Sequence, residues 1–236
     1  MQKILSTMRK AVEKYKLIQD GDKIAVGLSG GKDSLVLLKA LKMFQRFNIY
    51  NYDIIAVTID IYSGKEDYSH LKKFCDELGV EYVVEQTDIH QIVFDERAEK
   101  NPCSLCAKMR RGALNTVAIK YGCNKIALGH HLQDVIETFF LSLLYEGRLS
   151  TMKPKSYMSN SQITLIRPLF LTYENSIRSA SKGFPVKKSK CPADSNSKRQ
   201  DVEKLIENLN QLVPDSKKRI ESAILLTESY NMLDKE

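Results

Sequence analysis

Residues 25–34 combine two adjacent glycines with hydroxyl, ammonium and carboxylate side chains in one short segment. The residues up to Leu28 have the apolar, β-rich composition of a buried strand, and those from Asp33 onward have the periodicity of a helix. Such a junction leaves backbone N–H groups at the helix start, where the helix dipole also favours an anion. Gly30 and Gly31 allow a phosphate to approach the backbone closely. The segment therefore predicts a site for a di- or triphosphate.

Two common phosphate loops do not fit this segment. The Walker loop needs four residues between its first glycine and its Gly-Lys pair, and Gly27 lies one residue too close to that pair. The dinucleotide loop needs a third glycine where Asp33 or Ser34 stands. The order Ser-Gly-Gly-x-Asp-Ser instead resembles the loop of the ATP pyrophosphatases, the PP-loop family, in which ATP is bound by its pyrophosphate and adenylates a substrate. The alternative is a glycine turn that binds no ligand.

Two of the five cysteines, Cys103 and Cys106, stand close together in a predicted loop (101–106) at the start of a helix. A helix N-terminus lowers the pKa of a thiol, and two thiolates at this spacing provide half of a metal or cluster site. A redox pair and a chance pair are the alternatives. Cys191 lies in a polar, basic stretch where packing gives no reason for a cysteine. Cys75, within a helix, and Cys123, just before a strand, are predicted core residues.

Several segments of the chain resemble motifs of the tRNA 2-thiocytidine synthetases, a family within the PP-loop superfamily. The matching segments are 102–112, 129–138, Arg167-Pro168-Leu169, Phe184-Pro185 and the group Cys191, Asn196, Arg199 and Gln200. The resemblance covers roughly residues 20–210. It implies a sulfurtransferase that adenylates a pyrimidine carbonyl of tRNA, in a cytidine of the anticodon loop, and then replaces the oxygen by sulfur, so that ATP is cleaved to AMP and pyrophosphate.

The same resemblance implies a 4Fe-4S cluster bound by Cys103, Cys106 and Cys191. Three protein ligands for four irons leave one iron open, which could bind a sulfide and present it to the substrate. A catalytic persulfide on one cysteine and a zinc site are the alternatives. Members of the family often carry a further cysteine three residues before Cys191, and this chain has Lys188 there, which leaves Cys191 as the third ligand.

For the nucleotide, the resemblance implies that the glycine turn binds the β- and γ-phosphates of ATP together with Mg²⁺. The residues of this turn are Ser29, Gly30, Gly31, Lys32, Asp33 and Ser34. The catalytic candidates are Lys32, Asp33 and Asp134, with either carboxylate as a ligand of Mg²⁺. Asp134 is expected to be the most rate-sensitive carboxylate, and its alternative role is that of a helix-start acid favoured by the dipole. Further nucleotide-binding candidates are Asp60, Gly129 and His130. For His130 and His131 the alternative is local hydrogen bonding alone.

Short β-rich runs alternate with longer helical runs along the chain, which predicts an α/β fold with a parallel sheet covered by helices on both faces. The resemblance implies that this twisted sheet is of the PP-loop, adenine nucleotide α-hydrolase-like type. Strands are predicted over residues 23–28, 53–59, 81–85, 125–128 and 163–166. Helices are predicted over residues 1–17, 33–47, 67–78, 88–98, 105–121, 132–145 and 172–181, and in the tail from about residue 197. Because ligands of such sheets bind at the carboxyl ends of the strands, residues 29–34, Asp60 and residues 129–131 should share one edge.

We expect three parts in the chain. They are an N-terminal helix over residues 1–19, a PP-loop ATP-binding α/β domain over 20–170, and a small, basic, mainly helical C-terminal extension over 171–236 that carries Cys191. Residues 148–199 contain eleven Lys or Arg and two acids, a net charge of +9 against +7 for the whole chain. A local basic excess is typical of surfaces that bind nucleic acid, and it also occurs on solvated surfaces. Candidate contacts for tRNA phosphates are Arg110, Arg111, Lys153, Lys155, Lys187, Lys188 and Lys190.

No apolar run approaches the ~18 residues of a membrane span, and the N-terminus lacks the architecture of a signal peptide. An odd count of five cysteines argues against a secreted disulfide framework. We therefore expect a cytoplasmic protein without a membrane partner. The family resemblance implies tRNA as substrate and a cysteine desulfurase or free sulfide as sulfur donor, with homodimer formation left open. The alternatives are a tRNA ligase of the lysidine-synthetase type, thiolation of a uridine or a small molecule, and a non-catalytic RNA-binding or iron–sulfur module.

Overall fold

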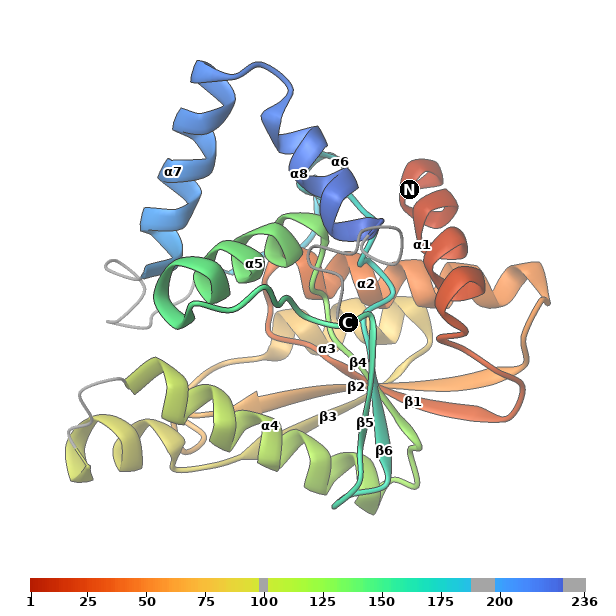
Figure 1. The fold of residues 1–236 in the computed structure, drawn as a ribbon. Coiled ribbons are helices and arrows are strands. Elements are labelled where there is room, and N and C mark those ends of the chain that lie inside the picture. Colours follow the sequence, from red (N-terminus) through yellow and green to blue (C-terminus); the bar gives the residue numbers. More distant parts are fainter. Residues whose placement is uncertain (98–101, 188–197, 227–236) are drawn as a thin grey trace. The chain divides into compact units, whose positions relative to one another are not determined.

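The computed structural model describes residues 1–97, 102–187 and 198–226 of the 236-residue chain (Figure 1). The chain forms two compact units. The first comprises Met1–His131 and Lys153–Ala193, and the second comprises Leu132–Met152 and Asp194–Glu236. This grouping differs from the predicted linear boundaries, because the N-terminal helix packs into the core of the first unit and a helix from the middle of the chain packs with the C-terminal helices. The functional division of the chain stays a prediction.

The first unit is built on a six-stranded sheet with the strand order β3-β2-β1-β4-β6-β5. The strands are β1 (Asp22–Gly27), β2 (Tyr52–Asp60), β3 (Glu81–Gln86), β4 (Lys125–Ala127), β5 (Lys155–Met158) and β6 (Ile163–Ile166). All neighbours pair in parallel except β5, which pairs antiparallel with β6. The predicted mainly parallel α/β fold is confirmed. Strand β5 was missed because its half-exposed sequence Lys-Ser-Tyr-Met lacks the apolar run of a buried strand.

Helices cover both faces of this sheet, as predicted (Figure 1). The helical elements of the unit are α1 (Gln2–Tyr15), α2 (Lys32–Phe44), α3 (Ser69–Leu78), α4 (Pro102–Lys120), α6 (Glu174–Ala180), the 3₁₀-helix η1 (Gln45–Phe47) and the π-helix η2 (Gln91–Glu96). Strand β1 shows the two-residue alternation directly, since Ile24 and Val26 join the core under α1, α2 and α3, whereas Ala25 joins the core under α4.

Helix α4 begins earlier than the sequence predicted. A loop over residues 101–106 and a helix from residue 105 were expected, but α4 starts at Pro102. Proline is well suited to a first helical position, because its missing N–H has no partner there and its φ already fits a helix. Cys103 and Cys106 therefore lie inside the first turns of a helix and not in a loop before it.

The second unit consists of α5 (Leu132–Glu146), α7 (Lys198–Leu212) and α8 (Ser216–Leu225), which confirms the predicted helical tail. Its core is formed by Leu132, Ile136 and Phe140 of α5 against Val202 and Ile206 of α7. Within the described residues of both units, no helix has the combination of length and apolar character needed to cross a membrane.

Candidate active site

Residues 29–34, called the phosphate loop below, are held in shape by their own serines. Gly30 has a φ of +79°, a left-handed conformation that glycine adopts without strain. The Ser34 hydroxyl donates to the Gly31 carbonyl at 2.9 Å and accepts from the backbone N–H of Ser29 at 3.2 Å. Among the residues that the structure describes, the N–H of Gly31, at the start of α2, makes only a long hydrogen bond of 3.4 Å to the Ser29 hydroxyl. The loop therefore presents backbone N–H and hydroxyl groups at a helix start, an arrangement that binds phosphate.

The Lys32 ammonium lies between two carboxylates of the first unit. Its Nζ is 3.3 Å from Asp33 Oδ2 and 3.3 Å from Glu174 Oε1, and Arg178 Nη2 lies 3.2 Å from the same oxygen of Glu174. Burial acts to lower the pKa of Lys32, but the two carboxylates outweigh it and the pKa is raised. Burial likewise acts to raise the pKa of Glu174, but Arg178 and Lys32 bring it below its usual value. Lys32 is therefore a permanent positive charge beside the phosphate loop.

The loop after β4 touches the start of α2. A Cβ atom at Gly129 would lie 2.9 Å from the carbonyl carbon of Asp33 and 3.0 Å from the nitrogen of Ser34, so only glycine fits there. His131 is buried, and its Nε2 lies 3.6 Å from Asp33 Oδ1. This Oδ1 is itself buried and has no hydrogen-bond partner among the residues that the structure describes. A buried carboxylate oxygen without a partner is costly, so Asp33 offers an acceptor that a bound cation or donor would satisfy.

His130 accepts a hydrogen bond from Arg167, which directly follows β6, the parallel neighbour of β4. Its Nδ1 accepts from Arg167 Nε at 3.2 Å, and Arg167 Nη1 donates to the Lys153 carbonyl at 2.6 Å. Because Nδ1 is the acceptor, a neutral His130 carries its proton on Nε2. The Arg167-Pro168-Leu169 motif therefore contributes the residue that fixes the orientation and tautomer of a neutral His130.

Asp60, at the end of β2, shapes the loop that follows it. Its carboxylate accepts from the N–H of Tyr62 at 2.9 Å, the N–H of Gly64 at 2.6 Å and the hydroxyl of Tyr68 at 3.1 Å. The ends of β1, β2 and β4 lie at one edge, because these strands are parallel neighbours. The predicted common edge for residues 29–34, Asp60 and residues 129–131 is confirmed, with Asp60 engaged in holding its own loop.

The two cysteines of α4 differ in exposure. Cys103 is exposed, whereas Cys106 is buried against Ile89 and Val93. Residues three apart lie on the same side of a helix, so both thiols stand on one face of α4. The predicted third ligand, Cys191, lies outside the described residues, and the three-thiolate centre stays a prediction. Elsewhere in the described ranges, no group of three or more His, Cys, Asp or Glu is placed to hold a metal ion.

Cys75 and Cys123 are buried core residues, as predicted. Burial raises the pKa of the Cys75 thiol to about 12 and that of the Cys123 thiol to about 11. Since the thiolate is the form that binds metal and attacks electrophiles, neither is suited to that chemistry near neutral pH.

Asp134 lies in the first turn of α5, in the second unit, and pairs with an arginine of α7. Arg199 Nη1 is 3.2 Å from Asp134 Oδ1, and Arg199 Nε is 3.1 Å from Glu137 Oε2. Burial raises the pKa of Glu137 to about 7, against the hydrogen bond from Gln133 and the attraction of Arg199. Arg199, singled out as part of the C-terminal motif, therefore binds the carboxylate predicted to be the most rate-sensitive.

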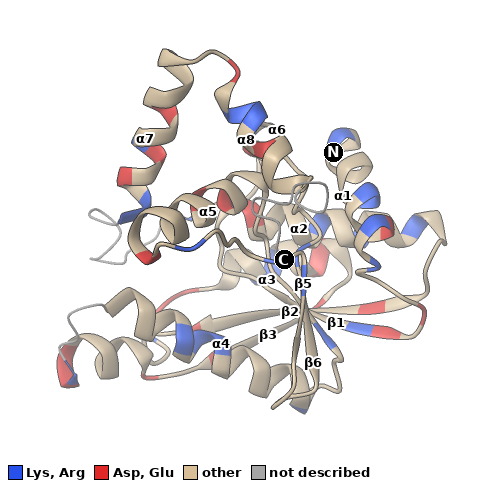
Figure 2. Cartoon of the chain, in the orientation of Figure 1, with Lys and Arg blue, Asp and Glu red and all other residues tan. Residues whose placement is uncertain are grey.

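A stretch of α4 consists largely of Lys and Arg positions (Figure 2). Lys108, Arg110 and Arg111 are exposed on this helix. Of the other predicted phosphate contacts, Lys153 and Lys187 are exposed and Lys155 is half-buried, with its ammonium donating to the Lys16 carbonyl at 3.1 Å. Lys188 and Lys190 lie outside the described residues. The basic surface next to Cys103 is therefore supplied by α4 itself.

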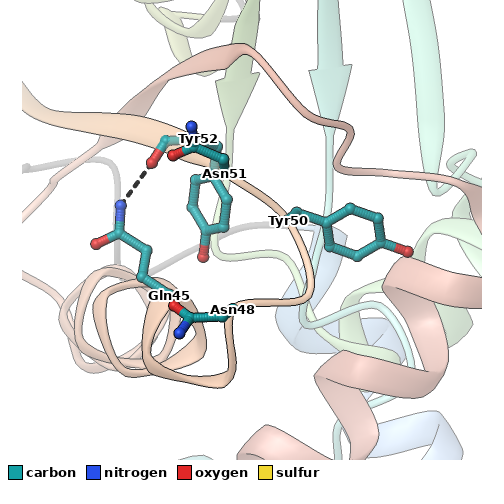
Figure 3. Close-up of a pocket in the computed structure, with 5 residues that line it drawn as sticks. All are labelled: Gln45, Asn48, Tyr50, Asn51 and Tyr52. Carbon is teal, nitrogen blue, oxygen red and sulfur yellow. Dashed lines mark hydrogen bonds between the residues drawn. The ribbon is translucent and has the colours of Figure 1, made fainter.

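A cleft of about 430 Å³ lies at the other edge of the sheet from the phosphate loop (Figure 3). It is lined by Gln45, Asn48, Tyr50, Asn51 and Tyr52. Tyr52 begins β2, whereas the phosphate loop follows the end of the parallel strand β1. The Gln45 amide donates to the Tyr52 carbonyl at 2.6 Å, and the Tyr52 hydroxyl donates to the Leu41 carbonyl at 2.7 Å, so these polar groups serve the fold. This cleft is separate from the predicted nucleotide site.

Known proteins match this chain over most of its length. The PP-loop domain, as a family model, matches residues 2–200. The tRNA-cytidine(32) 2-sulfurtransferase of Citrifermentans bemidjiense is 36% identical over 240 residues, which cover 99% of this chain and 93% of the relative. A tRNA-cytidine(32) 2-sulfurtransferase of Francisella philomiragia is 38% identical over 221 residues, which cover 91% of this chain and 86% of the relative. The chain belongs to the tRNA-cytidine(32) 2-sulfurtransferase family. The family resemblance inferred from the motifs is thereby confirmed, as is the PP-loop by which such enzymes use ATP.

A solved structure of a related thiolase agrees with the fold of this tRNA-cytidine(32) 2-sulfurtransferase family member. The U34-tRNA thiolase NcsA from Methanococcus maripaludis, solved with its 4Fe-4S cluster, superposes with a TM-score of 0.73 at 29% identity, covering 97% of this chain and 80% of the thiolase.

Two acids of this tRNA-cytidine(32) 2-sulfurtransferase family member, Glu174 and Glu137, are not among the site residues predicted from the sequence. Glu174 pairs with Lys32 from a distant part of the sequence, and nothing in its local pattern marks it. Glu137 carried a signal, since it is a charged residue on an otherwise apolar stretch of α5, three residues after Asp134. A buried acid that close to another acid is a sign of a functional or ion-pairing position.

Proposed function

We propose that this chain replaces the 2-oxygen of cytidine 32 in tRNA by sulfur at the expense of ATP. The observation that carries the proposal is the match to relatives of this activity over nearly their whole length, with the phosphate loop and the cysteine pair of α4 both present. The enzyme would act in the cytoplasm, on tRNA, with a cysteine desulfurase or free sulfide as sulfur donor. Homodimer formation belongs to the same proposal.

The first step is adenylation of the base. The 2-oxygen of the cytidine attacks the α-phosphorus of ATP, and pyrophosphate leaves with the electron pair of the broken P–O bond. The phosphate loop supplies Gly31 N–H, the hydroxyls of Ser29 and Ser34 and the charge of Lys32 for the β- and γ-phosphates, where negative charge increases as pyrophosphate leaves. Fixing the chain of phosphates in line with the attacking oxygen also lowers the entropic part of the barrier.

The carboxylate oxygen Asp33 Oδ1 fits a divalent cation at this loop. It is buried, it has no hydrogen-bond partner in the described part of the chain, and it stands at the start of the helix that follows the phosphate loop. Mg²⁺ bound there would neutralise phosphate charge. Asp134, the other predicted carboxylate, is held by Arg199 in the second unit, and its role at the metal stays part of the proposal.

The thiols of α4 fit the predicted iron–sulfur centre. Cys103, which is exposed, and Cys106, which is buried, share one face of α4, whereas Cys75 and Cys123 lie in the cores that cover the sheet. Together with Cys191 they would hold a 4Fe-4S cluster, which when bound supplies sulfide through its open iron. Sulfur delivered to C2 of the adenylated base would replace the original oxygen, which would leave as part of AMP. Buried His131 and the oriented His130 line the edge where the adenylated base must be kept from water.

The proposal is tested by nucleoside mass analysis of tRNA from cells that lack this protein and carry either the wild-type chain or a variant. We expect 2-thiocytidine to be restored by the wild-type chain and by Cys123→Ser, but not by Cys103→Ser or Cys106→Ser. Full restoration by both cysteine variants would exclude the thiolate centre. The structural likeness to a U34-tRNA thiolase makes uridine the second candidate, and a change in 2-thiouridine without a change in 2-thiocytidine would replace cytidine by uridine as substrate.

A further inference from the structure

The Phe184-Pro185 motif begins a short segment, residues 184–187, that has no role in the site as described so far. The segment follows α6 in the first unit, and the N–H of Val186 donates to the carbonyl of Phe184 at 2.8 Å. A bond between residues two apart closes a tight turn around Pro185, whose restricted φ already suits that turn. The segment therefore has a shape that its own sequence stabilises.

Phe184 fixes one end of this segment to the core. Its ring packs against Phe74 of α3 with 5.2 Å between the ring centroids, and the ammonium of Lys39 on α2 lies 4.8 Å above the same ring. Phe184 also packs against the core that contains the apolar residues of α1, α2 and α3. The segment thus starts from a rigid support on the two helices that flank the phosphate loop.

Lys187 connects the other end to two loops of the sheet edge. Its backbone N–H donates to the Gly30 carbonyl at 3.1 Å, and its ammonium donates to the Asp67 carbonyl at 3.0 Å. Gly30 belongs to the phosphate loop, and Asp67 precedes α3 in the loop after β2. One residue therefore links the loops that follow two neighbouring strands.

The bond to Gly30 has a consequence for phosphate binding. The carbonyl of Gly30 and the N–H of Gly31 belong to the same planar peptide group, so fixing the direction of one fixes the direction of the other. A peptide between two glycines can otherwise rotate at low cost, because neither residue restricts its dihedral angles. The Gly31 N–H makes only a 3.4 Å bond to Ser29 Oγ within its own loop. Its direction is therefore set largely by the bond that Lys187 makes to the carbonyl.

We propose that residues 184–187 form a positioning strap, in which the backbone N–H of Lys187 holds the Gly30–Gly31 peptide so that the Gly31 N–H points at the β- and γ-phosphates of ATP. The inference rests on the proposed ATP site and adds a residue group that acts through the phosphate loop without touching the nucleotide. It assigns separate tasks to the two parts of Lys187. The backbone N–H sets phosphate affinity, and the exposed side chain supports the neighbouring loop.

The test is the affinity of purified full-length variants for ATP and for AMP, which lacks the β- and γ-phosphates, measured by calorimetry. Lys187→Pro removes the N–H, and we expect the Kd for ATP to rise about five- to tenfold with the Kd for AMP within twofold of wild type. Lys187→Ala keeps the N–H and serves as the matched control, with both constants within about twofold of wild type because its lost bond is exposed.

A second pair of variants keeps the proposal testable if Lys187→Pro does not fold. Phe184→Ala loosens the strap at its anchor and should raise the Kd for ATP without raising that for AMP, and Phe184→Leu should restore ATP binding. Equal ATP affinity in Lys187→Pro and wild type, or equal loss of ATP and AMP binding in Phe184→Ala, would overturn the proposal. Absence of ATP binding in the wild-type chain would instead refute the proposed function.

Discussion

Two clusters in this molecule place one cation between two carboxylates, and the pKa of the glutamate is shifted in opposite directions in the two clusters. In the first unit, Lys32 lies 3.3 Å from both Asp33 and Glu174. In the second unit, Arg199 lies 3.2 Å from Asp134 and 3.1 Å from Glu137. The pKa of Glu174 is lowered, whereas that of Glu137 is raised to about 7.

Burial explains the difference. The Glu174 side chain is 29% exposed, and the opposing charges of Arg178 and Lys32 outweigh the cost of its partial desolvation. The Glu137 side chain is 4% exposed, and a single arginine does not outweigh the larger cost there. A partly exposed pair can exchange its partners for a ligand at little cost, so Lys32 is suited to bind phosphate. In the second unit the acid is buried while the Arg199 side chain is 40% exposed, and this pair is suited to join two helices, α5 and α7.

The largest effect is expected when the Lys32 ammonium is removed. Lys32→Met should lower kcat/KM for ATP by about 100- to 1,000-fold, because one preorganised charge at the departing phosphates is lost. The measurement is pyrophosphate release in the presence of tRNA. Lys72→Met is the matched control, since Lys72 pairs with Asp76 in a 67% exposed position on α3. Equal activity of the two variants would remove Lys32 from the phosphate site.

The second effect concerns stability and should separate the two clusters. Arg199→Met leaves Asp134 and the buried Glu137 without their cation, and at pH 8 it should destabilise the second unit by about 3 kcal/mol. Arg178→Met removes the 69% exposed partner of Glu174 and should cost less than about 1 kcal/mol. The measurement is the denaturation midpoint of each variant. Similar costs for both arginines would contradict the assignment of a structural role to Arg199 alone.

The sequence predicted the sheet well and the helix starts less well, for a physical reason. The five predicted strands agree with the observed ones to within one residue at each end, because buried parallel strands are apolar runs with sharp polar ends. Strand β5 was missed because an edge strand needs no apolar run. The predicted start of α4 is three residues too late, because proline is typical of loops and also of first helical positions.

In the candidate site, too, the features that depend on local sequence were predicted and those that depend on distant segments were not. Residues 29–34 and 129–131 were predicted because backbone chemistry at a strand end depends on local sequence, and the structure brings them together at Gly129 and Asp33. The side chains that pair with Lys32 and His130 could not be predicted, because they come from distant parts of the sequence. Glu174 pairs with Lys32, and Arg167 donates to His130. The cysteine pair was predicted from its spacing, and its third member stays a prediction.

The third effect is the pH dependence of stability that Glu137 introduces. Its pKa is about 7 in the folded chain against 4.5 for an ordinary glutamate. Between pH 4.5 and pH 7 the folded state therefore keeps a proton that the unfolded state has released. The resulting stabilisation is fully present below pH 4.5 and is lost as the pH rises through 7, by about 3 kcal/mol. In Glu137→Gln this dependence should disappear. Parallel stability curves for wild type and Glu137→Gln between pH 4.5 and 8 would show that burial does not control this acid.

The smallest effect tests whether Glu174 competes with phosphate for Lys32. Without nucleotide, the Glu174 carboxylate pairs with the Lys32 ammonium at a distance of 3.3 Å. ATP must displace this carboxylate before its phosphates can bind Lys32. Glu174→Gln should therefore tighten ATP binding by about two- to fourfold, a small change because the pair is partly exposed and screened. Arg178→Met keeps the Glu174–Lys32 pair and should leave ATP affinity unchanged or slightly weaker, because Glu174 then keeps Lys32 as its ion-pair partner. Added salt should narrow the difference between Glu174→Gln and wild type, since it weakens the competing pair. If Glu174→Gln weakens ATP binding instead, Glu174 holds Lys32 in place for the phosphates, and the exchangeable pair of the first unit is a positioning pair like the one that joins α5 to α7.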